Sequence, residues 1–421
     1  MYENLSLKWL YLDFNSYFST IEQQINTSIR YKPVAVVPSL TDYTCAIAAS
    51  YEAKKLGIKT GTMIFQAKKI CPELICVKAN HEKYIYYHHR LVSEINKYIP
   101  IDSVCSIDEV ACKLIGEETQ AKKAISIALS IKEGIKKNVG DYISCSIGIS
   151  TNKFLAKTAS NLKKPNGLKI LLKKNIPYRI KHFSLSDLTG IGKKMESRLV
   201  LSGINNIEKL YSLSPKNMRS IWGSVLGERF WHMIRGNEVA DIITNTNTIG
   251  HSHVLHPNWR NLEKSNLILK RLVLKAASRL RRKHYFCKKI RISMKSQCGK
   301  KVEGKRKFSK VNDSLTLMEE ANLVWKNIIK FHKLKNIKKI SVLLYDLEPI
   351  ACLQIDFLSS FCNKLNHSLE KRVVLSETMD KINSRFGRDS ITIGSVPNDI
   401  SPFSGTKVAF TRIPDIKEFY E

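Results

Sequence analysis

Two acidic side chains stand next to each other in the stretch CSIDEVACKL, at Asp108 and Glu109. A third acid, Asp13, lies near the end of the apolar run LKWLYLDF. Neighbouring carboxylates repel each other, and burying one without a partner is costly, so we expect a positive group between them. Carboxylates gathered at one edge of a sheet would suit Mg²⁺ or Mn²⁺, which prefer hard oxygen ligands. Two such ions about 4 Å apart would stabilise both the attacking and the leaving oxygen of a phosphoryl displacement.

Two strand segments must bring these acids together. The run LKWLYLDF predicts a buried strand that ends at Asp13, and residues 101–115 predict one strand, or two strands that meet around the acid pair. Successive side chains of a strand point to opposite faces, so Asp108 and Glu109 can share a site only if the backbone turns or bulges there. The spacing alone leaves an alternative open, an exposed hairpin turn with its acids in water.

The remaining periodicity predicts a mixed order of helices and strands up to about residue 167. Strands are expected at 33–37 and 143–149, with helices at 81–99 and 118–137. Residues 178–240 are expected to be mostly helical, and residues 245–258 look like a linker. Strands around KKIRISMK and KKISVLLYDL should then flank helices at 264–284 and 313–332, before a tail that starts near residue 350.

The charge of the chain predicts a polyanionic partner. Among 421 residues, 69 Lys and Arg face 37 Asp and Glu, a net charge of +32 that favours nucleic acid over an acidic membrane surface. Seventeen of these cations lie between Lys270 and Lys310, where Glu303 is the one acid. The length predicts two to four domains. Ten scattered cysteines without a CxxC pair predict reduced thiols and a cytoplasmic protein, and no apolar stretch is long enough to span a membrane.

Five motifs occur in a fixed order along the chain: LDFNSYFSTIE, AASYEAKKLGIKTG, CSIDEV, SIGISTNKFLAKTASNLKKPNGL and LTGIGKKMESRL. In this order they resemble the Y-family DNA polymerases, the translesion enzymes similar to DinB and UmuC proteins. The resemblance covers about residues 8–240 closely and continues more loosely to about 350. Two segments of the tail, MDKINSRFGRD and VAFTRIPD, resemble the C-terminal parts of some bacterial UmuC-like proteins.

The resemblance implies an α+β multidomain fold arranged like a right hand. It implies a ferredoxin-like palm at 1–26 and 79–178, small fingers at 27–78, and a helical thumb with a helix-hairpin-helix at 179–242. An α/β little finger is expected at 243–350, followed by a C-terminal tail at 351–421. The implied activity is template-directed nucleotidyl transfer from dNTP to a primer 3′-hydroxyl, with low-fidelity bypass of damaged template.

The resemblance also assigns the acids. In this family two Mg²⁺ ions, for which Mn²⁺ can substitute, lie on one Asp of the first strand and on the Asp-Glu pair. These positions match Asp13, Asp108 and Glu109, with the backbone carbonyl of Phe14 as a further ligand. After the acid pair the family usually has an aromatic residue and then an acid, where this chain has Ala111 and Lys113, so the local packing is expected to differ.

The nucleotide-binding positions of the family fall on residues from three motifs. The implied triphosphate contacts are Tyr51, Lys54 and Lys164, with backbone amides near Tyr17 and Phe18. Lys54 stands where many relatives have Arg, so a bidentate fork becomes a point charge. Phe18 matches the aromatic steric gate that excludes ribonucleotides by filling the space of a 2′-hydroxyl.

DNA contacts are implied in the C-terminal half and in the helix-hairpin-helix, whose glycines let backbone amides approach a phosphate. The expected DNA-binding residues are Gly190, Gly192, Lys193, Lys194, Arg281, Arg282, Lys288, Lys289 and Arg291. The peptide QIDFL resembles the short motifs that dock bacterial polymerases on the sliding clamp, through Gln354, Ile355, Phe357 and Leu358. The histidines at 251, 253 and 256 have no cysteine or acid at suitable spacing, so a linker strand is expected there rather than a metal site.

Two other classes of protein compete with this reading. A catalytically silent DNA-binding accessory subunit could share the fold, but the intact acids disfavour it. A nucleotidyl cyclase also uses carboxylates and two metals, but it has no need of a helix-hairpin-helix or of a basic C-terminal half. We therefore expect a polymerase with a monomeric catalytic unit, which binds primer–template DNA, dNTP and a sliding clamp, and no membrane.

Overall fold

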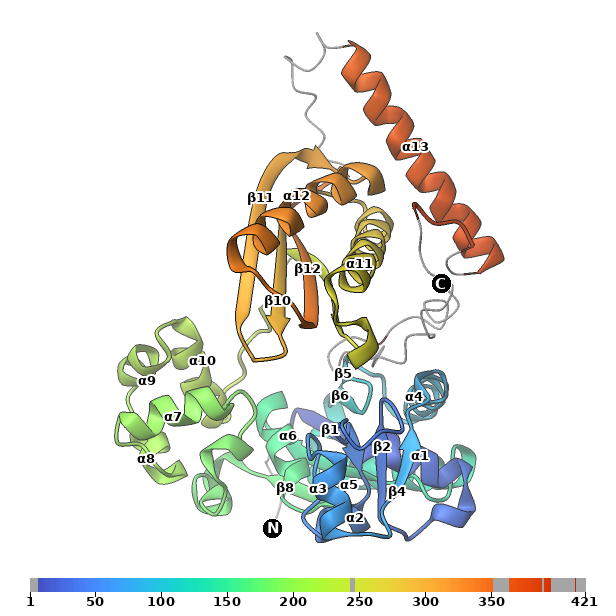
Figure 1. Ribbon diagram of the computed structural model, residues 1–421. Coiled ribbons are helices and arrows are strands. Elements are labelled where there is room, and N and C mark those ends of the chain that lie inside the picture. The colour runs from blue at the N-terminus through green and yellow to red at the C-terminus, as the bar shows by residue number, and fades with distance from the viewer. Residues whose placement is uncertain (1–6, 243–246, 351–362, 388–389, 395–412, 414–421) are drawn as a thin grey trace. The chain divides into compact units, whose positions relative to one another are not determined.

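The computed structural model describes residues 7–242, 247–350, 363–387, 390–394 and 413 (Figure 1). The chain divides into two compact units between Asp241 and Ile242. Within the described ranges, no helix combines the length and the apolar character needed to cross a membrane.

A five-stranded sheet forms the centre of the first unit, in the order β5-β6-β1-β7-β8. Its strands are β1 (Trp9–Phe14), β5 (Ser103–Ser106), β6 (Glu109–Lys113), β7 (Cys145–Ser150) and β8 (Leu168–Leu171). The middle strand β1 is buried along its whole length and pairs antiparallel with both β6 and β7, whereas β7 and β8 run parallel. The expected strand around the acid pair is two strands, β5 and β6.

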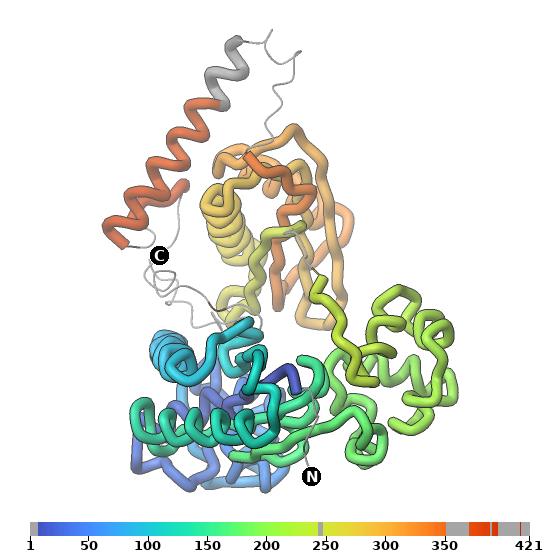
Figure 2. Tube along the Cα trace, turned by 180° about the vertical axis from the view of Figure 1, so that it is seen from behind, coloured from blue at the N-terminus to red at the C-terminus, as the bar shows by residue number. Residues whose placement is uncertain are grey.

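Four helices accompany this sheet: α1 (Tyr17–Ile25), α4 (His81–Ile95), α5 (Ala121–Asn138) and α6 (Lys153–Asn161). Helices α4 and α5 pack against each other, as the turned view in Figure 2 shows. Helix α6 packs on β1, β7 and β8, and it lies very close to the sheet at Gly148. A Cβ atom at Gly148 would stand 2.0 Å from the carbonyl oxygen of Ala156, so only glycine allows this approach.

Two smaller parts complete the first unit. A three-stranded sheet, β3-β2-β4, packs with two helices around Ile58 and Ile64; its elements are β2 (Val34–Val37), β3 (Ala48–Ala49), β4 (Ile75–Lys78), α2 (Tyr51–Lys55) and α3 (Ile64–Ile70). The expected helical section contains α7 (Lys193–Leu201), α8 (Ile207–Ser212), α9 (Pro215–Trp222) and α10 (Val225–Ile234). Short 3-10 helices cover Thr27–Ile29, Gly116–Thr119, Lys173–Asn175, Tyr178–Ile180 and Leu185–Asp187.

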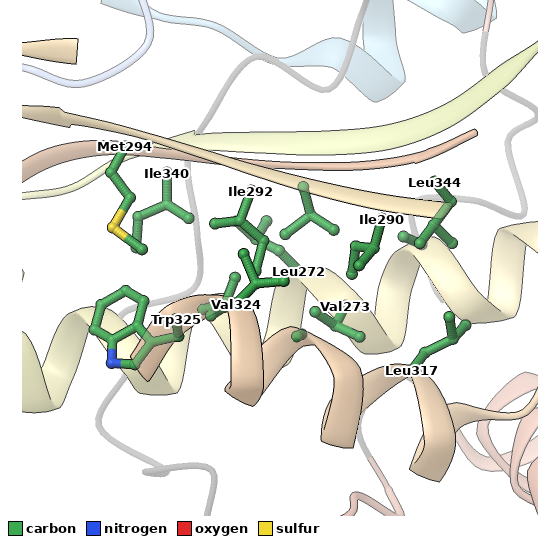
Figure 3. Close-up of a cluster of buried hydrophobic side chains, with 14 of the residues drawn as sticks. Leu272, Val273, Ile290, Ile292, Met294, Leu317, Val324, Trp325, Ile340 and Leu344 are labelled. Carbon is green, nitrogen blue, oxygen red and sulfur yellow. The ribbon is translucent and has the colours of Figure 1, made fainter. Parts of the chain in front are cut away.

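The second unit is an antiparallel sheet with helices on one face. The sheet has the order β11-β10-β12-β9, from β9 (Thr248–Val254), β10 (Tyr285–Ser296), β11 (Lys301–Val311) and β12 (Ile337–Pro349). The helices are α11 (Leu262–Arg282) and α12 (Ser314–His332), after a 3-10 turn at Pro257–Trp259. Figure 3 shows Ile290 and Ile340 from the sheet facing Leu272 and Trp325 from the helices across a hydrophobic core.

The predicted linker at 245–258 is corrected by the structure. Residues 248–254 form strand β9, which pairs with β12 from Thr248 opposite Tyr345 to Val254 opposite Lys339. Ile249 is buried in the core of the unit. The sequence indicated a linker strand around the histidines but not its place in the sheet, because histidine and glycine interrupt the apolar alternation.

The described part of the tail contains one long helix, α13 (Asn363–Phe386). Its Asp380 accepts hydrogen bonds from Nε and Nη2 of Arg281 at 2.7 and 3.0 Å, and its Ser376 hydroxyl accepts one from the amide of Ser314 at 3.0 Å. Helix α13 is therefore attached to both α11 and α12 of the second unit.

Candidate active site

The three acids meet at one end of the central sheet. Asp13 lies directly opposite Glu109 in the β1–β6 register, and directly opposed side chains share a face of the sheet. Asp108 lies in the turn at 107–108 between β5 and β6, next to a register shift between Val104 and Ser106. The backbone thus turns at the acid pair, which is the condition that alternating strand geometry imposes on a shared site.

Phe14 joins the acids through its backbone. Its amide donates a hydrogen bond to the carbonyl of Asp108 at 2.8 Å. Because the N–H and C=O of a residue in a regular strand point to the same side, we expect the carbonyl of Phe14 to face the turn that holds Asp108.

Two lysines and one serine contact the acids. The Lys164 ammonium lies 2.5 Å from Oδ2 of Asp13, and the Lys157 ammonium lies 2.7 Å from Oε2 of Glu109. The Ser106 hydroxyl donates to Oδ1 of Asp108 at 2.6 Å. Two carboxylates are therefore balanced by cations, while Asp108 has a neutral partner.

Burial acts against the charged form of two of these acids. It raises the pKa of Asp13 above the ordinary value, and the Lys164 ammonium opposes this rise. Burial also raises the pKa of Asp108, opposed by the Ser106 hydroxyl and reinforced by the negative charges of Glu109 and Asp13. The site therefore holds more negative charge than its surroundings stabilise, which favours a bound cation.

The donors at this site fit a hard divalent cation. Three carboxylates lie at one end of the sheet, on the turn at 107–108 and on the two strands beside it, and oxygen ligands of this kind suit Mg²⁺ and Mn²⁺. Among the described residues, no three His, Cys, Asp or Glu side chains are close enough together to hold a metal ion. The carboxylates of Asp13 and Glu109 contact lysines instead. A cation at this point would take over part of the charge balance that Lys157 and Lys164 supply.

The expected triphosphate residues lie around the same acids. The Lys54 ammonium donates to the Ser16 hydroxyl at 2.6 Å and lies 4.7 Å from the centre of the Tyr51 ring. Burial lowers the pKa of Lys54, and the positive charge of Lys164 lowers it further. Burial raises the pKa of Tyr51 to about 12, so its hydroxyl stays protonated as a hydrogen-bond donor. The structure thus brings Tyr51, Lys54 and Lys164 together.

Tyr17 and Phe18 begin helix α1 directly after the acid at the end of β1. The Tyr17 hydroxyl donates to the carbonyl of Tyr84 at 2.6 Å. The Phe18 ring stacks on the Tyr84 ring, with centroids 4.5 Å apart and an interplanar angle of 18°. Tyr84 is itself fixed by a 2.6 Å hydrogen bond from its hydroxyl to Glu22. Phe18 is therefore held in one orientation.

The glycines of the expected helix-hairpin-helix have the geometry of a tight turn before a helix. Gly190 has a φ of +92°, in the left-handed region that favours glycine, and Gly192 caps the N-terminus of α7. Lys193 and Lys194 form the first turn of that helix and line a surface hollow. Free amides and lysines at a helix start are suited to an anion such as phosphate.

The basic residues of the second unit differ in their surroundings. Lys289 lies opposite Tyr345 in the β10–β12 pairing, and the Arg291 guanidinium lies 5.3 Å from the Tyr345 ring centre. These side chains alternate with the buried Ile290 and Ile292, so they occupy the face of the sheet that is turned away from α11 and α12. Lys288 contacts Glu348, and Arg282 is exposed.

Arg281 does not fit the DNA contact that we expected of it. Its side chain is 7% exposed and is bound by Asp380 and by the carbonyl of Asn312 at 2.7 Å. These partners direct the guanidinium toward α13, so we assign Arg281 to packing and leave it out of the DNA-binding proposal. The expected clamp residues Gln354, Ile355, Phe357 and Leu358 lie outside the described residues.

Sequence reasoning missed four residues that contact the site. They are Tyr11, Ser16, Ser106 and Lys157. Lys157 lies inside a quoted motif, but a lysine in a helix is usually solvated, and nothing in its spacing indicates a partner 48 residues away. The alternation in β1, which puts Tyr11 on the face of Asp13, was the one signal that could have found Tyr11.

Comparison with known proteins shows which family this chain resembles. Residues 12–161 match the impB/mucB/samB family, and residues 246–357 match the C-terminal domain of the same family. The DNA polymerase IV of Moorella thermoacetica is 30% identical over 68% of this chain and 72% of its own length. The DNA polymerase IV of Oceanobacillus iheyensis is 26% identical over 96% of this chain and 95% of its own.

The chain belongs to the Y-family of DNA polymerases. A solved structure, a Y-family DNA polymerase chimera of Dbh and Dpo4, has the same fold, with a TM-score of 0.68 and 21% identity over 80% of this chain and 98% of its own. The predicted family, the multidomain α+β fold and the activity of a translesion DNA-directed DNA polymerase are thereby confirmed. The alternative of a silent accessory subunit finds no support in these comparisons. Membership also implies the use of a divalent metal and of primer–template DNA and dNTP.

Proposed function

We propose that this Y-family polymerase extends a primer by two-metal nucleotidyl transfer at Asp13, Asp108 and Glu109. The single observation that carries the proposal is the placement of these acids on the turn and the facing strand, with the amide of Phe14 hydrogen-bonded to the carbonyl of Asp108. Two Mg²⁺ ions, or Mn²⁺ in their place, would be held by these four residues. When bound, the metals would activate the primer 3′-hydroxyl and stabilise the pyrophosphate leaving group.

The lysines of the site have separate roles in this proposal. Lys54 and Lys164 supply ammonium donors to the triphosphate, and Tyr51 supplies its hydroxyl. Support comes from their position: Lys164 contacts Asp13, and the charges of Lys164 and Asp13 both act on Lys54. Lys54 stands where many relatives have an arginine that can donate two hydrogen bonds, so it binds phosphate through a single ammonium charge. The backbone amides near Tyr17 and Phe18 complete the set of hydrogen-bond donors to the triphosphate.

The remaining assignments concern the nucleic acid. Gly190, Gly192, Lys193 and Lys194 bind a backbone phosphate without reading sequence, which the left-handed turn and the helix start support. Arg282, Lys288, Lys289 and Arg291 bind duplex at the second unit, supported by the basic outer face of β10. The domain bounds predicted from the sequence, the monomeric catalytic unit and the clamp peptide at 354–358 belong to the same proposal.

The test is primer extension with Mg²⁺ by wild type and by Asp108→Ala, on undamaged and abasic templates. Loss of one metal-binding carboxylate removes several kcal/mol of transition-state stabilisation, so we expect the rate to fall by roughly a thousandfold or more. DNA binding should persist, because Asp108 contacts no DNA in the proposal. The matched control is Asp102→Ala, an acid before β5 that lies outside the site and should leave extension unchanged.

Extension past the abasic site by wild type, and its loss in Asp108→Ala, would assign the translesion activity to the proposed metal site. Full activity of Asp108→Ala would contradict the metal site, whereas intact DNA binding without any extension by wild type would return the accessory-subunit alternative.

A further inference from the structure

Glu109 is held through only one of its two carboxylate oxygens. The Tyr11 hydroxyl donates to Oε2 at 2.8 Å, and the Lys157 ammonium lies 2.7 Å from the same atom. Among the hydrogen bonds and ion pairs of the described residues, none engages Oε1 of Glu109. Two donors on one oxygen fix the orientation of the carboxylate and leave its other oxygen for a further ligand.

The strand register explains why Tyr11 can reach Glu109. Tyr11 lies opposite Ala111, two residues after Glu109 on β6, so both residues point to the same face of the sheet. The small side chain of Ala111 leaves room for the Tyr11 ring, which is 2% exposed and packs in a cluster with Trp9, Ala111 and Ala156.

Helix α6 supplies the second donor from above the same face. The ammonium of Lys157 lies 5.5 Å from the centre of the Tyr11 ring as well as on Glu109. The ring therefore borders the lysine while its hydroxyl shares the carboxylate oxygen. Tyr11, Lys157 and Glu109 form a connected group at the edge of the proposed metal site.

We infer that Tyr11 is a positioning residue, which together with Lys157 fixes Oε2 of Glu109 so that Oε1 is presented to a divalent metal. This inference rests on the proposed metal site. Groups that orient a metal ligand without touching the metal typically contribute about 10–100-fold to metal affinity. Since Lys157 stays in place when Tyr11 is changed, we expect the lower end of that range, about tenfold.

The experiment compares wild type with Tyr11→Phe, which keeps the buried ring and removes only the hydroxyl. Direct Mn²⁺ binding to the protein with primer–template DNA is measured by electron paramagnetic resonance of the free ion. The rate of primer extension is measured separately as a function of Mg²⁺ concentration. We expect Tyr11→Phe to weaken Mn²⁺ binding about tenfold and to raise the half-saturating Mg²⁺ concentration, while the rate at saturating Mg²⁺ stays within about twofold of wild type.

The matched control is Tyr98→Phe. The Tyr98 hydroxyl also donates to a glutamate, Glu94 at 3.3 Å, but this pair lies at the end of α4 and outside the metal site. Its metal dependence should equal that of wild type. Thermal unfolding of both variants separates a loss of folding from a loss of metal: a Tyr11→Phe protein that unfolds at the wild-type temperature and still binds Mn²⁺ more weakly supports the inference.

Different results overturn different statements. If Tyr11→Phe binds Mn²⁺ and responds to Mg²⁺ as wild type does, while Asp108→Ala is inactive, the positioning role is wrong and the proposed metal site stands. The positioning role is also wrong if Tyr11→Phe unfolds at a lower temperature than wild type and the unfolded fraction accounts for the whole loss of Mn²⁺ binding. If Asp108→Ala extends primers normally, both the metal site and the role of Tyr11 fall.

Discussion

At the scale of single residues, the best-defined side chain beside the acids is Phe18. It stacks on Tyr84, which is anchored by Glu22, and it is 6% exposed. A buried side chain that stacks on an anchored ring cannot swing away when a bulkier sugar enters, because rotation would require the neighbouring ring to move. This rigidity supports the steric gate that the family resemblance assigns to Phe18.

We therefore expect Phe18→Ala to raise the ratio of ribonucleotide to deoxyribonucleotide incorporation by about tenfold or more, because the truncated side chain leaves space for a 2′-hydroxyl. Single-nucleotide insertion with rNTP and dNTP measures this ratio. The control is Phe331→Ala, an exposed aromatic residue at the end of α12 that should leave the ratio unchanged. Equal sugar discrimination in wild type and Phe18→Ala would remove Phe18 from the role of gate.

The sequence predicted part of the site at this scale, for a physical reason. Asp108 and Glu109 stand in one local motif at a turn, whereas Asp13 reaches them only through the pairing of β1 with β6, which the family resemblance implied and no local pattern did. The donors on Glu109 depend on long-range geometry, since Tyr11 is 98 residues away from it in the chain. No local pattern states which strand lies opposite which, so Tyr11 and Lys157 could not be assigned before the register was known.

At the scale of elements, strand β9 shows the same limit. A linker strand was expected at its histidines, but the sequence did not show that this strand belongs to the sheet of the second unit. Helices α11 and α12 were predicted within a few residues, because their apolar faces repeat at helical spacing over several turns. Long periodic helices can thus be predicted from the sequence, whereas the formation of a short edge strand depends on the strand that it pairs with.

His253 on β9 makes the stability of the second unit depend on pH. Burial, together with the positive charges of Lys275 and Arg271, lowers its pKa to about 4, whereas the unfolded chain has a histidine pKa of about 6.5. Between these two pKa values the histidine binds a proton in the unfolded state but not in the folded state. The free energy of unfolding therefore falls as the pH drops from about 6.5 toward 4. We expect a loss of about 2 kcal/mol across this window.

Thermal or urea unfolding at several pH values between 7.5 and 4.5 measures this loss, and His253→Gln should flatten the profile. The exposed His332→Gln, on α12, should keep the wild-type slope. A profile that is the same in wild type and His253→Gln would assign the pH dependence to other groups.

Helix α13 is held by the ion pair between Asp380 and the buried guanidinium of Arg281. Asp380→Ala would leave that charge without its partner, so we expect the docking of α13 to weaken by about 2 kcal/mol, less than for a fully buried pair because Asp380 is 30% exposed. Amide hydrogen exchange over residues 370–386 measures the docking.

Glu319→Ala is the matched control for this change. The control breaks the ion pair between Glu319 on α12 and Arg372 on α13. Because Glu319 is 59% exposed, the pair should contribute about 1 kcal/mol or less. If both variants exchange at the same rate as wild type, the ion pair of Arg281 does not hold the helix.

At the scale of the whole molecule, the net charge of +32 dominates association with DNA. Each phosphate neutralised by a cation releases counterions, so affinity for duplex should fall about 10³-fold or more between 50 and 200 mM salt if six or more phosphates are contacted. Fluorescence anisotropy of labelled primer–template measures the slope. Arg291→Ala should reduce the slope by about one ion, whereas Lys326→Ala, on the exposed side of α12, should not change it. Equal slopes for all three proteins would contradict a DNA contact at Arg291.

The lysines on the acids have a consequence for how the ligands of the enzyme influence one another. With Lys157 on Glu109 and Lys164 on Asp13, two of the three acids have a cation as partner before a metal binds, and Asp108 has none. A divalent ion bound at Asp13 would take the place of the Lys164 ammonium, which could then turn to the triphosphate, while Lys157 stays on Glu109. Metal and triphosphate should therefore raise each other's affinity by the same factor, a reciprocity required by thermodynamics. We therefore expect neither ligand to be held tightly alone, and the site to fill with both together.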